Sequence, residues 1–125
     1  MKLRIRGDSV RLRLTRGEVA ALLKSGVVAE ATRFPGGEGF HYRLTAAADC
    51  PALAASFADG MLTVALPEQL ARHWAESNEV GIRAGLPLRG GELAILIEKD
   101  FPCLVERPGE DDSDAFAANE LRPKC

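Results

Sequence analysis

Apolar and charged residues alternate along residues 3–6 and again along residues 10–14. A period of two is typical of a β-strand with one buried face. The tripeptide between the two segments, Gly7-Asp8-Ser9, is typical of a tight turn. The pattern therefore predicts a β-hairpin, and its apolar face is expected to carry Leu3, Ile5, Val10, Leu12 and Leu14.

A helix is predicted directly after this hairpin. Thr15 is a good N-cap, and Glu18 three residues later completes a capping box. Gly26 occupies the position at which a left-handed residue commonly ends a helix. Residues 27–34 and 39–46 then read as two further strands, so the first half of the chain predicts the order ββαββ.

The second half of the chain repeats this order of turn, helix and proline positions 52 residues later. Turn, helix and proline positions keep one register: Gly7-Asp8 falls on Asp59-Gly60, residues 18–25 on 70–77, and Phe34-Pro35 on Leu86-Pro87. Hairpins and amphipathic helices are common, so chance is the alternative explanation. We favour two ββαββ repeats, about residues 3–46 and 55–98, because the turn, cap and proline positions all keep this register. Two units would also share one core, since a single unit of about 50 residues buries too little surface to be stable alone.

The expected fold is α+β with pseudo-twofold symmetry. About eight mostly antiparallel strands would form a barrel or a two-layer sheet with two helices. The segment 93–97 is apolar throughout, which predicts a strand that is covered on both faces and runs through the centre of the fold. Residues 1–98 are expected to form a single duplicated domain, and residues 99–125 an irregular acidic tail packed on that domain.

Composition and charge exclude several classes of protein. The 125 residues are 46% apolar, carry a net charge of −2 and contain no apolar run long enough to span a membrane. Residues 1–60 carry nine basic against six acidic side chains, and residues 100–125 carry three against seven. This balance argues against general nucleic-acid binding. Three cysteines make no disulfide framework, so the cytoplasm is the expected compartment.

The charged face of the first hairpin is a candidate anion site. Strand alternation places four guanidinium groups opposite the apolar face, those of Arg4, Arg6, Arg11 and Arg13. Arginine binds phosphate and carboxylate through paired hydrogen bonds. An ordinary solvated strand face is the alternative interpretation.

The tail carries a tight acidic cluster at residues 110–114 and two of the three cysteines. A metal site could be assembled from Cys103, Asp111, Asp114 and Cys125, but the spacing of known zinc and calcium motifs is absent. A solvated tail is one alternative, and pairing of the acidic cluster with the arginine face is another. We expect no bound metal and no cofactor, and the sequence indicates no catalytic residue.

Both ends of the chain resemble one family of small, uncharacterised bacterial proteins. The resemblance rests on Lys2-Leu3-Arg4-Ile5-Arg6-Gly7-Asp8-Ser9-Val10-Arg11-Leu12-Arg13-Leu14-Thr15, on Ile97-Glu98-Lys99-Asp100-Phe101 with Cys103-Leu104, and on Glu110-Asp111-Asp112-Ser113-Asp114. It implies a free-standing bacterial domain in which the arginine hairpin and the acidic tail occur together, and it implies no catalytic role.

Three functions are compatible with these observations. The leading hypothesis is a binding or interaction module without catalytic activity, whose partner is a protein or a small anionic ligand. The second is an enzyme or binder of a phosphorylated small molecule that uses the arginine hairpin. The third is a metal-binding protein that uses the acidic, cysteine-containing tail. We expect no membrane partner.

Overall fold

The computed structural model describes residues 1–101, which contain eight strands and two helices. In chain order these are β1 (Lys2–Ile5), β2 (Ser9–Leu14), α1 (Arg16–Ser25), β3 (Val27–Arg33), β4 (Gly39–Ala47), β5 (Ala54–Ala58), β6 (Met61–Pro67), α2 (Glu68–Glu76), β7 (Gly81–Leu88) and β8 (Gly91–Lys99). The α+β class predicted from the sequence is confirmed.

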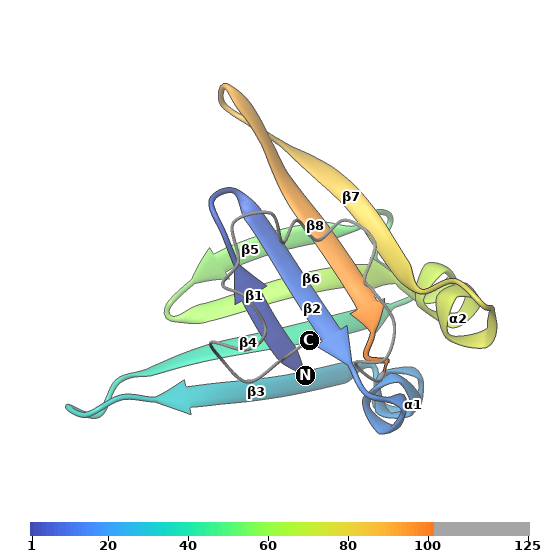
Figure 1. The fold of residues 1–125 in the computed structure, drawn as a ribbon, viewed down its shortest axis with the longest axis horizontal. Helices are drawn as coiled ribbons and strands as arrows, with labels where there is room; N and C mark the ends of the chain where they lie inside the picture. Colours follow the sequence, from blue (N-terminus) through green and yellow to red (C-terminus); the bar gives the residue numbers. More distant parts are fainter. Residues whose placement is uncertain (102–125) are drawn as a thin grey trace, which may run out of the picture.

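The strands form two four-stranded sheets. Sheet A has the strand order β1-β2-β8-β7, and sheet B has the order β3-β4-β6-β5. In Figure 1 the strands of sheet A run diagonally across those of sheet B. Strand β8 lies between β2 and β7, so it is an internal strand of sheet A. The prediction that it is covered on both faces is wrong, because Ala94 on its outer face is exposed.

The strands do not close a barrel, so the barrel alternative in the sequence analysis is wrong. Within the described residues, β1 and β7 are the edges of sheet A, and β3 and β5 are the edges of sheet B. The four hairpins are antiparallel, but the central pairs β2–β8 and β4–β6 are parallel. Both sheets are therefore mixed.

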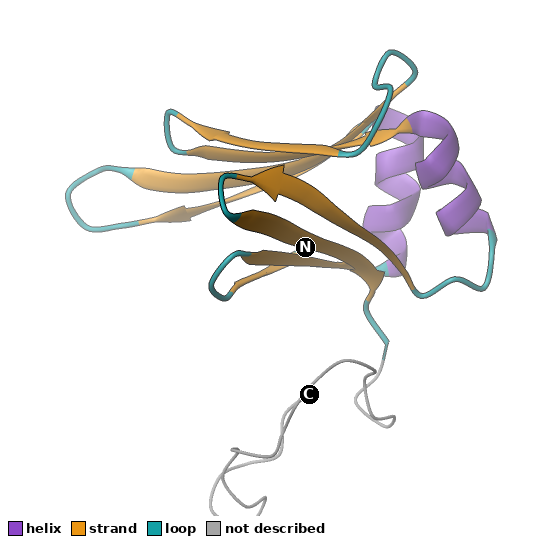
Figure 2. Ribbon diagram, turned by 90° about the horizontal axis from the view of Figure 1, so that it is seen from above, coloured by secondary structure: helices purple, strands orange, loops and turns teal. Residues whose placement is uncertain are grey.

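The helices carry the chain between the sheets. Helix α1 connects β2 of sheet A to β3 of sheet B, and α2 connects β6 of sheet B back to β7 of sheet A. Both helices lie at the same end of the two sheets (Figure 2). Trp74 of α2 is fully buried there, and its indole N–H donates to the carbonyl oxygen of Val80 at 3.1 Å. No helix in residues 1–101 has the length and apolarity needed to span a membrane.

The predicted caps of α1 are confirmed. The Thr15 hydroxyl accepts from the backbone N–H of Glu18 at 3.3 Å, and the Glu18 carboxylate accepts from the N–H of Thr15 at 2.9 Å. Gly26 has a φ of 80°, and its N–H donates to the carbonyl oxygen of Leu22. A left-handed residue at this position is most easily a glycine.

The core fills the space between the two sheets and the helices. Alternate residues of the first hairpin point into it as predicted, because Val10, Leu12 and Leu14 are buried. Leu3 is partly buried, whereas Ile5 is 55% exposed. The other fully buried large side chains are Leu22, Leu44, Leu66, Val64, Trp74 and Ile97.

The α-ammonium group of Met1 is buried between α1 and β3. It forms ion pairs with the carboxylates of Glu18 in α1 and Glu30 in β3, and the Tyr42 hydroxyl donates to the Met1 carbonyl oxygen at 3.1 Å. Burial alone lowers the pKa of the ammonium, but hydrogen bonds and charges from the two carboxylates outweigh burial and raise it. For Glu18, burial raises the pKa, but the ammonium and Thr15 outweigh burial and lower it.

Candidate functional site

Three arginines lie in one row across the outer face of sheet A, the face that points away from the core. Arg4 of β1 is opposite Arg11 of β2, Arg11 is beside Leu96 of β8, and Leu96 is opposite Arg83 of β7. Residues paired in register project from the same face of a sheet. We call Arg4, Arg11 and Arg83 the arginine row.

The neighbouring row on this face contains a charge cluster centred on Glu98. Its carboxylate accepts from the Nε of Arg11 at 2.8 Å and from the Nε of Arg13 at 2.5 Å. The Arg11, Arg13 and Glu98 side chains are only 14%, 11% and 8% exposed. Lys2 extends the cluster through an ion pair with Asp100 at 3.2 Å. Glu98 therefore offsets part of the positive charge and holds two guanidinium groups in fixed orientations.

Of the four arginines predicted to share a face, three lie in these two rows. Arg4, Arg11 and Arg13 project from the outer face of sheet A. Arg6 follows the end of β1 and lies in the turn, where its N–H donates to the carbonyl oxygen of Ser9. The four side chains are therefore not one block on paired strands.

Arg83 belongs to this face although the sequence pattern does not predict it there. Arg83 alternates with Ile82 and Ala84, so the pattern places it on the polar face of its own hairpin. That hairpin reaches the first one only through the parallel pair β2–β8. A pattern within one hairpin cannot predict that the two hairpins pair through β2 and β8.

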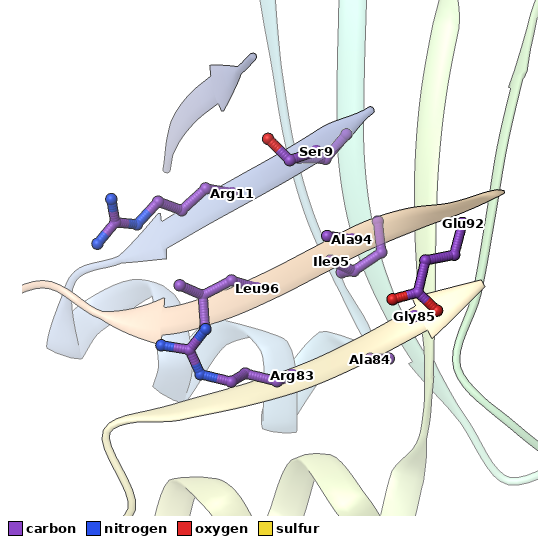
Figure 3. A pocket seen from close by; sticks show the side chains of 10 residues that line it. Ser9, Arg11, Arg83, Ala84, Gly85, Glu92, Ala94, Ile95 and Leu96 are labelled. Atoms are coloured by element: carbon purple, nitrogen blue, oxygen red, sulfur yellow. The ribbon is translucent and has the colours of Figure 1, made fainter. Parts of the chain in front are cut away.

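A hollow of about 560 Å³ adjoins the arginine row (Figure 3). Its physical cause is a row of three small residues, in which Ser9 is beside Ala94 and Ala94 is opposite Gly85. Arg11 and Arg83 stand at one side of this low floor. The hollow therefore combines an open floor with two cationic side chains.

Glu92 supplies a carboxylate to the other side of the same hollow. Its side chain folds back over Gly85, and a β-carbon built on Gly85 would lie 2.7 Å from the carboxyl carbon of Glu92. The carboxylate occupies this place because residue 85 has no side chain. Figure 3 shows it above Gly85, on the side of the hollow away from Arg11.

A second, apolar hollow of about 370 Å³ lies at the mouth between the sheets, away from the helices. It is lined by side chains from both sheets, including Ile5, Phe40, Phe57 and Leu93. The rings of Phe40 and Phe57 are stacked with centroids 5.8 Å apart, and Phe57 is 62% exposed. This lining contains no charged side chain, so it cannot form ion pairs with a ligand as the hollow on sheet A can.

The predicted metal ligands Cys103, Asp111, Asp114 and Cys125 lie outside the described residues. Within residues 1–101, no group of three or more His, Cys, Asp or Glu side chains is placed to hold a metal ion. Among residues 1–101, the site on sheet A therefore consists of charged side chains around a floor of small residues.

Comparison with models of protein families places most of the chain in a family. A model of a family described as a family of unknown function (DUF7009) matches residues 1–120. No curated protein and no solved structure matches the chain.

Proposed function

The chain belongs to this family of unknown function, and from the geometry of sheet A we propose that it is a non-catalytic binding module for an anionic partner. The observation that carries the proposal is the arginine row, which aligns Arg4, Arg11 and Arg83 on one outer face beside an open hollow. Guanidinium groups bind phosphate and carboxylate with paired, charge-assisted hydrogen bonds.

The support is electrostatic as well as geometric. Several cations on one face repel each other, and an anion placed among them relieves that repulsion. The contacts of Glu98 with Arg11 and Arg13 hold these side chains in place before a ligand arrives, which lowers the entropy lost on binding. Each exposed ion pair contributes only about 0–1 kcal/mol. A useful ligand therefore contacts more than one arginine.

Titration with pyrophosphate, followed by calorimetry, tests this proposal. Arg83→Gln should weaken binding about two- to fivefold, the loss of one exposed ion pair. Arg43→Gln is the matched control, because Arg43 is an exposed arginine of β4 on sheet B whose Nε donates to Thr63. Equal weakening by both variants, or no binding by the parent protein, would contradict the proposal.

The chain itself contains a candidate anionic partner. Residues 110–114 carry four acidic side chains and lie outside the described residues. We propose that residues 99–125 pack back on the domain, with Asp111, Asp112 or Asp114 within ion-pair distance of Arg4, Arg6, Arg11 or Arg13. The opposite charges of the two chain ends support this arrangement.

We also propose that residues 1–98 are a duplicated domain with a pseudo-twofold axis. Support comes from the two parallel pairs, because exchanging the halves turns β2–β8 into β6–β4. An experimental structure should superpose residues 3–46 on residues 55–98 by a rotation near 180°, and a different strand placement in the two segments would refute the duplication.

The proposed setting is the bacterial cytoplasm. The low cysteine content supports it, because a chain that folds without a disulfide framework suits a reducing compartment. Cys50 is a free thiol, and its Sγ lies 3.2 Å from the carbonyl oxygen of Ala52.

A further inference from the structure

We propose that the hollow on sheet A binds a small zwitterion, with its anionic group at Arg83 and its ammonium group at Glu92. This inference rests on the proposed anion-binding function and names the class of ligand. The reason is that the hollow carries opposite charges on its two sides. A ligand with only an anionic group would bind the arginine side of the hollow and leave the Glu92 carboxylate without a partner in the ligand.

Arg83 and Glu92 are both available to a ligand as far as the described residues are concerned. Neither side chain forms a hydrogen bond or an ion pair with any residue from 1 to 101. Both residues are exposed. The two side chains carry opposite charges, line the same hollow and do not form an ion pair with each other. A ligand with one group of each charge could therefore bind both.

The spacing of the two charges follows from the register. Arg83 is in the row of Leu96, whereas the Glu92 carboxylate lies over Gly85, two residues further along β7. Two residues of a strand span about 7 Å. In Figure 3 the Arg83 side chain is directed toward Leu96, and the Glu92 carboxylate lies over Gly85. The matching ligand therefore has its ammonium and its anionic group several bonds apart.

The floor between the two charges suits the connecting part of such a ligand. It consists of Ser9, Ala94 and the backbone of Gly85, which leave room above the sheet. The volume of about 560 Å³ lies within the range of small-molecule sites. An alkyl segment would contact Ala94 and Leu96 while its ends reach the charges.

Three six-carbon probes test the inference on the full chain. They are 6-aminohexanoate, hexanoate and hexylamine, and binding is followed by the amide shifts of Gly85 and Ala94. We expect 6-aminohexanoate to bind about fivefold more tightly than hexanoate, which lacks only the ammonium group. Hexylamine, which lacks the carboxylate, should also bind more weakly than 6-aminohexanoate.

Variants at Glu92 assign the preference to this carboxylate. Glu92→Gln should remove the advantage of 6-aminohexanoate over hexanoate, and Gly85→Ala should reduce it because the new methyl group displaces the Glu92 carboxylate. Glu38→Gln is the matched control, because Glu38 is an exposed acid between β3 and β4 in the other sheet. It should leave the preference unchanged.

The outcomes separate this inference from the proposed function. Equal binding of 6-aminohexanoate and hexanoate would overturn the zwitterion assignment and leave anion binding intact. Failure of both to bind, together with failure of pyrophosphate, would overturn both proposals. Equal binding of hexylamine and 6-aminohexanoate would also overturn the assignment, since Arg83 would then have no part in recognition.

Discussion

At the scale of single residues, Glu98 fixes the orientation of two arginine side chains on the outer face of sheet A and offsets part of their positive charge. Glu98 is the only buried polar or charged residue among residues 1–101. Two arginines contact it, and each would otherwise face the other across a poorly solvated space. A buried acid that orients two cations is expected to stabilise the fold and to prepare the surface for the proposed anionic ligand.

We predict that Glu98→Gln destabilises the protein by about 1–3 kcal/mol, because a poorly solvated charge loses its partner. Urea unfolding of the variant and the parent measures this difference. Glu92→Gln is the control, since the exposed Glu92 contacts no cation among the described residues and should change stability by less than about 0.5 kcal/mol. A Glu98→Gln variant as stable as the parent would show that the cluster does not support the fold.

The Met1 ion pairs predict how stability depends on pH. The pKa of the ammonium is raised in the folded state, so its contribution is complete below about pH 8 and declines as the pH rises through the folded pKa. The pKa of Glu18 is lowered, so its contribution is complete above about pH 4.5 and declines as the pH falls through the folded pKa. The melting temperature should be highest between these limits.

Acetylation of the α-amino group isolates this contribution. The acetylated chain should melt at a lower temperature at pH 7 and lose the decline that the parent shows as the pH rises above about 8. If acetylated and free chains melt identically across this range, the ammonium makes no net contribution to stability.

At the scale of secondary-structure elements, the sequence predicts local features well and pairing between distant elements poorly. The first hairpin, the α1 caps and the interior position of β8 follow from turn residues, capping chemistry and an apolar run. The parallel pairs β2–β8 and β4–β6 do not follow, because their contacts depend on how the helices carry the chain between sheets. The same limit explains why Arg4 and Arg11 were predicted for the site and Arg83 was not.

The α1 cap provides a prediction at this scale. Thr15→Ala should destabilise the protein by about 1 kcal/mol, the usual value for loss of an N-cap hydroxyl. Thr32→Ala is the control, because Thr32 is exposed on β3 and caps no helix. Thermal unfolding of both variants measures the difference, and equal melting temperatures would mean that the capping box contributes nothing.

At the scale of the whole molecule, charge is distributed unevenly. Residues 1–60 have an excess of basic side chains, and residues 100–125 have an excess of acidic ones. The outer face of sheet A adds Arg83 to the basic residues of the first hairpin. A single surface therefore serves as the proposed site for external anions and as the proposed docking face for residues 110–114.

Truncation after Pro108 tests the docking proposal. The truncated protein should lose stability at low salt, and the loss should shrink as salt concentration rises because salt screens exposed ion pairs. It should also bind pyrophosphate more tightly, since its own competing carboxylates are removed. Unchanged melting and unchanged amide shifts of the first hairpin would show that residues 109–125 do not dock there.

Metal analysis tests the remaining alternative at this scale. We expect no stoichiometric zinc in protein purified without chelator, because the cysteines and histidines lack zinc-ligand spacing. About one equivalent of zinc, lost in a Cys103→Ser variant, would contradict this expectation and favour the metal-binding hypothesis.

The most direct test of the central claim is a map of amide shifts during titration of the full chain with pyrophosphate. We predict that the largest changes cluster at Arg11, Leu96 and Arg83 on three adjacent strands of sheet A and weaken as salt concentration rises. Shifts concentrated on sheet B, or spread evenly over the surface, would contradict an anion-binding site at the arginine row.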